Sequence, residues 1–157
     1  SKGVFDTRSR SARCAGMMES LRIPASLRAV PPLSEVVRSV ATHLSEDVEF
    51  VNKVEIGVAE AVNNIIMHGY AGIESGHINV EIKSAADYIC IVLSDAAPCF
   101  NPLAKLKEDA AGMDLDAVTE RSLGMGVQII RNAMDHIEYK KLPNGNQLVM
   151  YKLIPSK

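Results

Sequence analysis

The sequence contains no tryptophan, and aromatic residues make up only 4% of its 157 residues. Its core must therefore be built mainly from aliphatic side chains, and a chain of this length can bury such a core as one domain without disulfides or metals. No apolar run is long enough to span a membrane, and no secretory signal pattern is present. Internal repeats and low-complexity segments are also absent. We therefore expect one domain that makes no membrane contact.

The charge balance and the cysteines further limit which class of protein this can be. The formal net charge of −2 gives no support to direct binding of nucleic acid. Cys14, Cys90 and Cys99 are odd in number and lack the spacing of metal ligands. Cys90 lies in an apolar run and is predicted to belong to the core. These features favour a reduced, cytoplasmic setting.

The first 17 residues differ in composition from the rest of the chain. They contain four basic residues, several small ones and little periodicity. We predict that residues 1–17 form a flexible N-terminal arm and that residues 18–157 form the folded domain.

Hydrophobic periodicity predicts the secondary structure of that domain. Helices are expected where apolar residues recur every three or four positions, and strands where they alternate or form short apolar runs. The predicted elements, in chain order, are a strand at Glu19–Pro24, helices at Leu33–Leu44 and Val51–Tyr70, strands at Ile78–Ile82 and Tyr88–Leu93, a loop at Leu103–Ser122, a helix after Gly126, and strands at His136–Leu142 and Gln147–Ile154. Pro143–Asn146, between the last two strands, is a hairpin signal. Strands joined by tight turns give a mostly antiparallel mixed sheet, and about three helices on one face complete a two-layer α/β (α+β) sandwich.

The helix predicted at Val51–Tyr70 carries a polar line beside its apolar face. Glu60, Asn64 and His68 follow one another at steps of four, so they lie along one flank of the helix. Gly57 lies on the same line one turn earlier. An interior glycine costs about 0.5–1 kcal/mol relative to alanine, which suggests that another element approaches closely there. A carboxylate, an amide and an imidazole at the edge of a buried face indicate a site, and the alternative is an ordinary solvated helix surface.

Two further segments carry residues typical of ligand sites. Asp95-Ala96-Ala97-Pro98 follows the apolar strand, and Gly124-Met125-Gly126 precedes the next helix. Each segment alone is a weak signal, because an aspartate after a strand is usually a turn former and short glycine motifs are common in loops. Together with the polar helix line, their order and spacing form a much stronger pattern.

These three segments resemble the nucleotide-binding boxes of the Bergerat-fold ATPases, which include histidine kinases and gyrase. Within that superfamily the chain looks most like the anti-sigma factor serine kinases of bacterial partner-switching systems. The segments that carry this likeness read EAVNNIIMHGY, DAAPCFNP and RSLGMGVQIIRNAMDHIEY. The resemblance runs from about Ser20 to Ile154. It implies the Bergerat ATP-binding fold, in agreement with the predicted sandwich, and it implies ATP and Mg²⁺ as cofactors.

The resemblance assigns roles to the residues of the helix. Asn64 matches the residue that ligates the metal, and an amide oxygen is a suitable ligand for Mg²⁺, which fills its other positions with water and phosphate. Glu60 matches the presumed general base, which takes a proton from an incoming hydroxyl as that oxygen attacks the γ-phosphate. His68, where the family often has histidine, is expected to bond backbone at the helix end rather than to take part in catalysis.

The resemblance also assigns roles to the other two segments. Asp95 matches the residue that accepts a hydrogen bond from the adenine amino group, which would select adenine over guanine. The backbone of Gly124, Met125 and Gly126 would come close to the phosphates, beside a helix N-terminus that attracts anions. Arg121 either meets phosphate charge or is a solvated loop residue.

One position departs from the family pattern. The family normally has glycine two residues after the aspartate, where the backbone passes close to the adenine, and this chain has Ala97 instead. If the backbone angles there suit only glycine, alanine costs about 1 kcal/mol or more. The added methyl group would then weaken nucleotide binding.

The resemblance predicts an ATP-dependent serine/threonine-protein kinase that also acts as an anti-sigma factor. Such a protein would sequester a sigma factor or a similar client, and it would phosphorylate a STAS-domain anti-anti-sigma factor. The second hypothesis, motivated by Ala97, is a binding module that senses nucleotide, or has lost it, and acts by sequestration alone. A histidine kinase is disfavoured, since the residues given hold no phosphoacceptor helix domain. The resemblance also suggests a homodimer.

Overall fold

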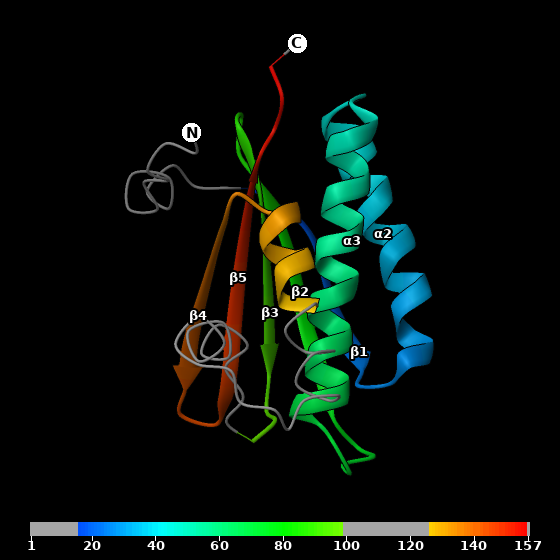
Figure 1. The fold of residues 1–157 in the computed structure, drawn as a ribbon, viewed down its shortest axis with the longest axis vertical. Helices are drawn as coiled ribbons and strands as arrows, with labels where there is room; N and C mark the ends of the chain where they lie inside the picture. The colour runs from blue at the N-terminus through cyan, green and yellow to red at the C-terminus, as the bar shows by residue number, and fades with distance from the viewer. Residues whose placement is uncertain (1–15, 99–125, 157) are drawn as a thin grey trace.

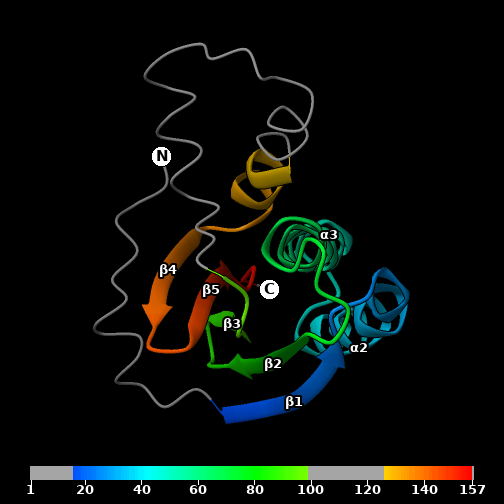
Figure 2. The same cartoon turned by 90° about the horizontal axis from the view of Figure 1, so that it is seen from below.

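The computed structural model describes residues 16–98 and 126–156, which form the predicted two-layer sandwich (Figure 1). Five strands make one sheet in the order β1-β2-β3-β5-β4, and every neighbouring pair of strands is antiparallel. The helices cover one face of this sheet (Figure 2). The elements are β1 (Gly16–Pro24), η1 (Leu27–Ala29), α2 (Val30–Leu44), α3 (Val48–Asn64), η2 (Ile65–Gly69), β2 (His77–Ser84), β3 (Tyr88–Asp95), a helical segment at residues 126–133, β4 (His136–Leu142) and β5 (Gly145–Leu153). The predicted fold class is confirmed.

Two of the predicted segments fall largely outside the described residues. Most of the predicted arm at residues 1–17 lies there, as does the whole predicted loop at Leu103–Ser122. β1 begins at Gly16, so the last two residues of the predicted arm belong to the sheet. No helix within residues 16–98 and 126–156 is both long and apolar enough to cross a membrane.

Local capping decides where the two long helices begin. Pro31 and Pro32 lie in the first turn of α2, where a missing backbone N–H breaks no helical hydrogen bond. The Asp47 carboxylate accepts a hydrogen bond from the backbone N–H of Phe50 at 2.9 Å, which caps α3. Because of this cap, α3 begins at Val48, three residues before the predicted start.

The core lies between the sheet and the helices. Ile78, Val80 and Ile82 alternate along β2 and are fully buried, as their period of two predicts. β3 is buried on both faces, because its other side packs in a small second cluster that joins Cys90 to Tyr151. Burial raises the pKa of the Cys90 thiol to about 11, which keeps the thiol protonated and unreactive. The prediction that Cys90 is a core residue is confirmed.

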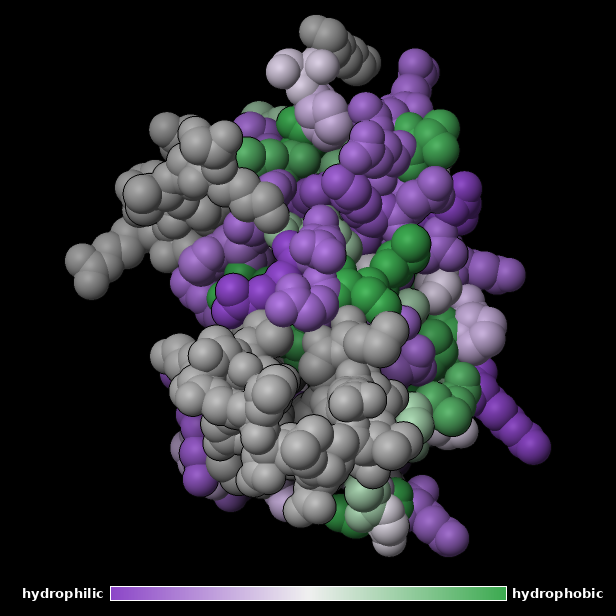
Figure 3. Space-filling view, in the orientation of Figure 1, coloured by the Kyte–Doolittle hydropathy of each residue, from purple (hydrophilic) through white to green (hydrophobic). Residues whose placement is uncertain are grey.

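The exposed hydrophobic residues of the described part of the chain lie on several elements. On the face shown in Figure 3, hydrophobic residues appear in several separate places among hydrophilic ones. The exposed apolar side chains of the described residues include Ile56 and Met67 on the helix side and Leu153 at the end of β5. Single exposed apolar residues of this kind are normal for a globular protein.

The helical segment at residues 126–133 lies against α3 at Gly57. A β-carbon at Gly57 would be 2.5 Å from Met134 Cε and 3.3 Å from Ala133 Cβ. In a close-packed interior such short distances would force the neighbours to move. The close approach predicted from this interior glycine is therefore confirmed, and the neighbour is the end of the last helix.

The final turn of the predicted long helix is wider than an α-helix. α3 ends at Asn64, and η2 is a π-helical turn in which the Tyr70 N–H donates to the carbonyl five residues earlier at 2.9 Å. Because a π-turn holds more residues, a step of four no longer completes a turn. His68 lies within this π-turn, and its place on the polar line of α3 stays a prediction. His68 is half-buried, and this burial lowers the pKa of its imidazole, which favours the neutral form.

Candidate functional site

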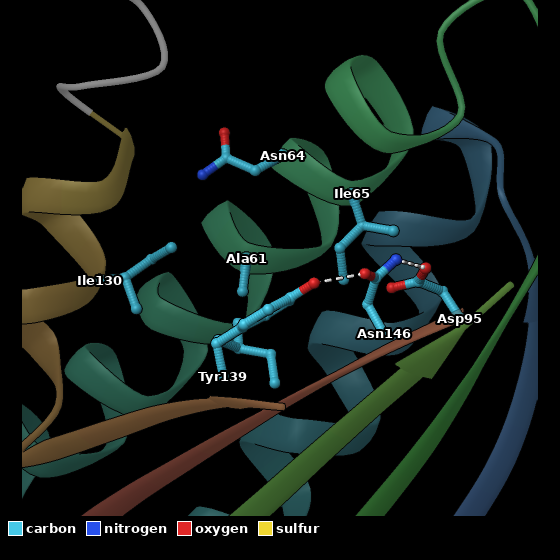
Figure 4. A pocket seen from close by; sticks show the side chains of 8 residues that line it. Ala61, Asn64, Ile65, Asp95, Ile130, Tyr139 and Asn146 are labelled. Carbon is cyan, nitrogen blue, oxygen red and sulfur yellow. Dashed lines mark hydrogen bonds between the residues drawn. The ribbon is translucent and has the colours of Figure 1, made fainter. Parts of the chain in front are cut away.

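A pocket lies where α3, the last helix and the sheet meet (Figure 4). The cavity is small, with a volume of about 10 Å³. The residues that line it come from six elements and are Ala61, Asn64, Ile65, Asp95, Ile130, Tyr139, Asn146 and Leu148. Two of the predicted site residues, Asn64 and Asp95, therefore share one pocket although they are far apart in the sequence.

Asn64 presents an unsatisfied amide to this pocket. The residue is 7% exposed, and its Nδ2 atom has no hydrogen-bond partner among the described residues. A buried donor without a partner costs about 1–3 kcal/mol, so its presence in a native fold needs a reason. A bound molecule that accepts a hydrogen bond from Nδ2 would supply that reason.

The described start of the last helix faces Asn64 directly. A β-carbon at Gly126 would lie 3.0 Å from Asn64 Oδ1 and 3.1 Å from Nδ2, so a larger residue would crowd the amide. N–H groups near the start of a helix have no partner within it and attract anions. Gly126, the last residue of the predicted glycine turn, therefore lies beside the predicted helix flank at Asn64. Arg121, Gly124 and Met125 lie outside the described residues.

Asp95 offers one free carboxylate oxygen. Its Oδ1 atom accepts two hydrogen bonds at 2.9 Å, one from the Ala97 N–H and one from the Asn146 side-chain amide. Its Oδ2 atom has no hydrogen-bond partner in the part of the chain that the structure describes, so it can accept one from a ligand. Burial raises the pKa of Asp95, and the two hydrogen bonds oppose this shift because they stabilise the carboxylate.

Ala97 does not carry the strain that a glycine-only conformation would impose. None of the described non-glycine residues has a positive φ angle. Pro98 follows Ala97, and a residue before proline favours extended backbone, which alanine adopts readily. Ala97 is buried, and its carbonyl accepts a hydrogen bond from Asn146 Nδ2 at 3.1 Å. Ala97 therefore does not have the glycine-only backbone angles that would strain an alanine at this position.

Tyr70 holds the backbone that follows Asp95. Its buried hydroxyl accepts a hydrogen bond from the Ala96 N–H at 2.9 Å and donates one to the His77 carbonyl at 2.8 Å. One side chain thus links the turn after η2, the start of β2 and the turn after β3. These two hydrogen bonds hold in place the backbone next to Asp95.

The sequence did not predict three residues of the site: Tyr70, Tyr139 and Asn146. Tyr139 donates its hydroxyl to Asn146 Oδ1 at 2.5 Å, and Asn146 is itself buried. The signal around Asn146 indicates only a hairpin, whereas its pairing opposite Asp95 depends on the register of β5 against β3. A correct prediction of that register would have placed Asn146 in the site.

Glu60 lies one turn before Asn64 on α3 and is half-buried. It is not among the residues that line the pocket. The structure therefore brings Asn64 and Asp95 around one space, with Gly126 beside Asn64 and Glu60 on the neighbouring turn of α3. The role of Glu60 as a base stays a prediction.

The described residues fit a metal ion that arrives with its own ligands. No group of three or more His, Cys, Asp or Glu side chains within residues 16–98 and 126–156 could hold an ion. The Asn64 oxygen is a hard ligand of the kind that Mg²⁺ accepts when water and phosphate oxygens occupy its other positions. The donor set thus suits Mg²⁺ that enters together with a phosphate compound.

A nucleotide has a base edge to recognise and a chain of negative charges to accommodate, and Asp95 and Asn64, which both line the pocket, are the residues predicted for these two needs. The fold and the site together define a nucleotide-binding ATPase domain. A family model described as "Histidine kinase-like ATPase domain" matches residues 23–152, and the chain belongs to this family.

Relatives of this chain include kinases and anti-sigma factors. The chain is 26% identical to the "Serine-protein kinase RsbW" of Oceanobacillus iheyensis over 136 residues, which cover 85% of each chain. It is 28% identical to the "Serine-protein kinase RsbW" of Listeria monocytogenes over 140 residues, which cover 88% of each chain. It is 29% identical to the "Anti-sigma F factor" of Clostridium beijerinckii over 117 residues, which cover 74% of this chain and 80% of the relative. The likeness to anti-sigma factor kinases is confirmed.

Proposed function

We propose that this protein is an ATP-dependent serine/threonine-protein kinase that also acts as an anti-sigma factor. The observation that carries the proposal is the unpartnered Nδ2 atom of Asn64, a residue that lies beside Gly126 and lines the pocket that also contains Asp95. The relatives support both activities, because they are named as serine-protein kinases and as an anti-sigma factor.

In the proposed complex, the base contacts Asp95. The free Oδ2 atom would accept a hydrogen bond from the adenine amino group, whereas guanine would place a keto oxygen against it. Two acceptors that face each other in a partly desolvated pocket repel. Asp95 would therefore select adenine and reject guanine.

The phosphates would lie between Asn64 and the turn at Gly124–Gly126. Asn64 Oδ1 would hold Mg²⁺, and Asn64 Nδ2 would donate to a phosphate oxygen. When bound, the ion would neutralise charge on the phosphates. The absence of a side chain at Gly126 leaves room for these contacts. Arg121 and Met125 stay predicted members of this site.

Replacing Glu60 by glutamine tests the proposed transfer step. Glutamine keeps the size of the side chain but cannot take a proton from the attacking hydroxyl, so transfer should fall about a hundredfold. Binding of ATP should change by less than about twofold, since Glu60 does not line the pocket. The rate is measured as transfer of labelled phosphate from ATP to a cognate STAS-domain protein.

Glu55→Gln is the matched control for this experiment. Glu55 lies on the same helix but pairs with Arg38 at 2.6 Å on an exposed surface, so its loss should leave transfer unchanged. Full transfer by the Glu60→Gln variant would rule out the base role.

The proposed partners are a sigma factor or similar client and a STAS-domain anti-anti-sigma factor. The kinase would place a phosphate group on a hydroxyl of the STAS-domain antagonist, at the interface between the antagonist and this protein. The phosphate would add charge and a desolvation cost there, so the phosphorylated antagonist would be released. Sequestration of the client would then follow from kinase activity. The homodimer and the cytoplasmic setting stay predictions.

The competing function is sequestration alone, by a module that senses nucleotide or has lost it. The backbone at Ala97 is unstrained, so a weakening of ATP binding at this position would come only from the methyl group of Ala97. Titration calorimetry with ATP and Mg²⁺ separates the two functions. A kinase should release heat on binding, whereas no heat and no thermal shift at millimolar nucleotide would favour the module.

Binding of ATP should weaken in mild acid because of Asp95. Burial raises the pKa of this carboxyl, so as the pH falls through the raised value Asp95 takes up a proton and Oδ2 becomes a poorer acceptor. The affinity should therefore start to fall at a higher pH than an ordinary aspartate would cause. Fluorescence titrations from about pH 7 to about pH 4.5 measure this, with Asp95→Asn as the reference. The same pH profile in both proteins would contradict the prediction.

A further inference from the structure

Tyr139 and Asn146 form a chain of hydrogen bonds that ends on Asp95 (Figure 4). The Tyr139 hydroxyl donates to Asn146 Oδ1 at 2.5 Å, and Asn146 Nδ2 donates to Asp95 Oδ1 at 2.9 Å. The three side chains come from β4, β5 and β3, and all of them line the pocket. The chain of bonds therefore runs along the pocket wall and stops at the residue proposed to meet the base.

The chemistry of the partners fixes the orientation of the Asn146 amide. The ionised Asp95 carboxylate and the Ala97 carbonyl can only accept hydrogen bonds, so the NH₂ group must face them and the amide oxygen must face Tyr139. Nδ2 donates to both acceptors, at 2.9 Å and 3.1 Å. Both of its hydrogens are used, so Asn146 has no donor left for a ligand. Its contacts serve to hold Asp95 rather than to contact the base.

The amide holds the Asp95 side chain and the backbone after it at the same time. The Ala97 N–H completes this small network with a second hydrogen bond to Asp95 Oδ1. Asn146 is 4% exposed, so water cannot readily replace its contacts. Asp95 Oδ1 therefore already accepts two hydrogen bonds from the protein, and Oδ2 is the oxygen that can accept one from a bound molecule.

We propose that Asn146 and Tyr139 are positioning residues that make the pocket selective for a base with an exocyclic amino group. They act through Asp95, because they determine which carboxylate oxygen the base meets and hold that oxygen in place. The inference rests on the proposed nucleotide-binding function and adds to it two residues on which base recognition depends.

The test compares ATP with purine riboside triphosphate, which lacks the amino group. One hydrogen bond to a charged group makes the wild-type chain bind ATP about tenfold to a hundredfold more tightly than the analogue. Asn146→Leu is similar in size but has no donor, and it should reduce that ratio to about twofold. Tyr139→Phe keeps the ring, so it serves as a second variant if Asn146→Leu fails to fold, and it should reduce the ratio about threefold.

Gln147→Leu is the matched control. Gln147 is next to Asn146 on β5 but points to the other face of the sheet, where Nε2 donates to Ser94 Oγ at 3.3 Å. Its loss should leave the ratio unchanged. A purely structural role for Asn146 and Tyr139 would weaken binding of both nucleotides equally, so an unchanged ratio in both variants overturns the inference alone. If the wild-type chain binds neither nucleotide, the proposed function and the inference both fail.

Discussion

Asn64→Ala is expected to weaken binding of ATP with Mg²⁺ about a hundredfold and to reduce phosphate transfer at least about a thousandfold. Alanine removes both the ligand oxygen and the free N–H donor, which lie against the helix start at Gly126. One contact to a charged group is worth about 1.5–3 kcal/mol in binding, and charge stabilisation in the transition state adds to that loss. Calorimetry measures the affinity, and labelled phosphate measures the transfer.

The stability of the fold should change little in the same variant. The wild-type Asn64 Nδ2 is buried without a partner, so its removal relieves a desolvation cost of about 1–3 kcal/mol, which offsets the small cavity left behind. The melting temperature should therefore stay within about 5 °C of the wild-type value. Asn63→Ala removes the neighbouring amide, which does not line the pocket, and should leave binding intact. Wild-type affinity in the Asn64→Ala protein would show that phosphates bind elsewhere.

Gly145→Ala is expected to lower the free energy of unfolding by about 2–3 kcal/mol. A β-carbon at Gly145 would overlap the backbone carbonyl oxygen of Asp95 and lie 2.9 Å from the Cα atom of Ala96. Both obstacles are backbone atoms, so no change of side-chain rotamer can relieve the overlap, and the hairpin must shift against β3. Urea denaturation measures the change.

Gly16→Ala provides the comparison for this measurement. No atom lies within 4 Å of the position that a β-carbon would take at Gly16, so stability should stay within about 0.5 kcal/mol of the wild type. Because the next residue, Asn146, pairs with Asp95, Gly145→Ala should also weaken ATP binding. A Gly145→Ala protein as stable as the Gly16→Ala protein would mean that the two strands separate there without cost.

Much of the fold could be predicted because its signals are local. Alternation of apolar and polar residues predicted β2, and an unbroken apolar run predicted β3. Apolar residues at helical spacing predicted α2 and α3. Asn64 and Asp95 were identified from the order of short motifs, and both line the pocket. Gly57 indicated a close neighbour from its position alone, without naming that neighbour. The predictions of β2, β3 and the helices needed only the chain within a few residues, whereas those of Asn64 and Asp95 needed the order of the motifs and the family resemblance.

What the sequence did not reveal depends on contacts between distant segments. Asn146 reaches Asp95 across 51 positions of the chain, and the Ala96 N–H meets the Tyr70 hydroxyl across 26. Periodicity tells which face of a strand a residue occupies, but it does not tell which strands are neighbours. The π-turn η2 is likewise followed by Tyr70, whose hydroxyl bonds the backbone of both His77 and Ala96.

The contact at Gly57 has a consequence for how nucleotide affinity can vary. Gly57 precedes Asn64 by about two turns, or roughly 10 Å along α3, and the last helix rests on α3 at both positions. The spacing between the Asn64 amide and the start of that helix is therefore controlled partly by packing at a place that no phosphate reaches. A larger side chain at position 57 would have to displace Met134 and press on Ala133, and we expect this to change the spacing at the proposed phosphate site. Binding strength can thus evolve while every residue that touches the nucleotide stays the same.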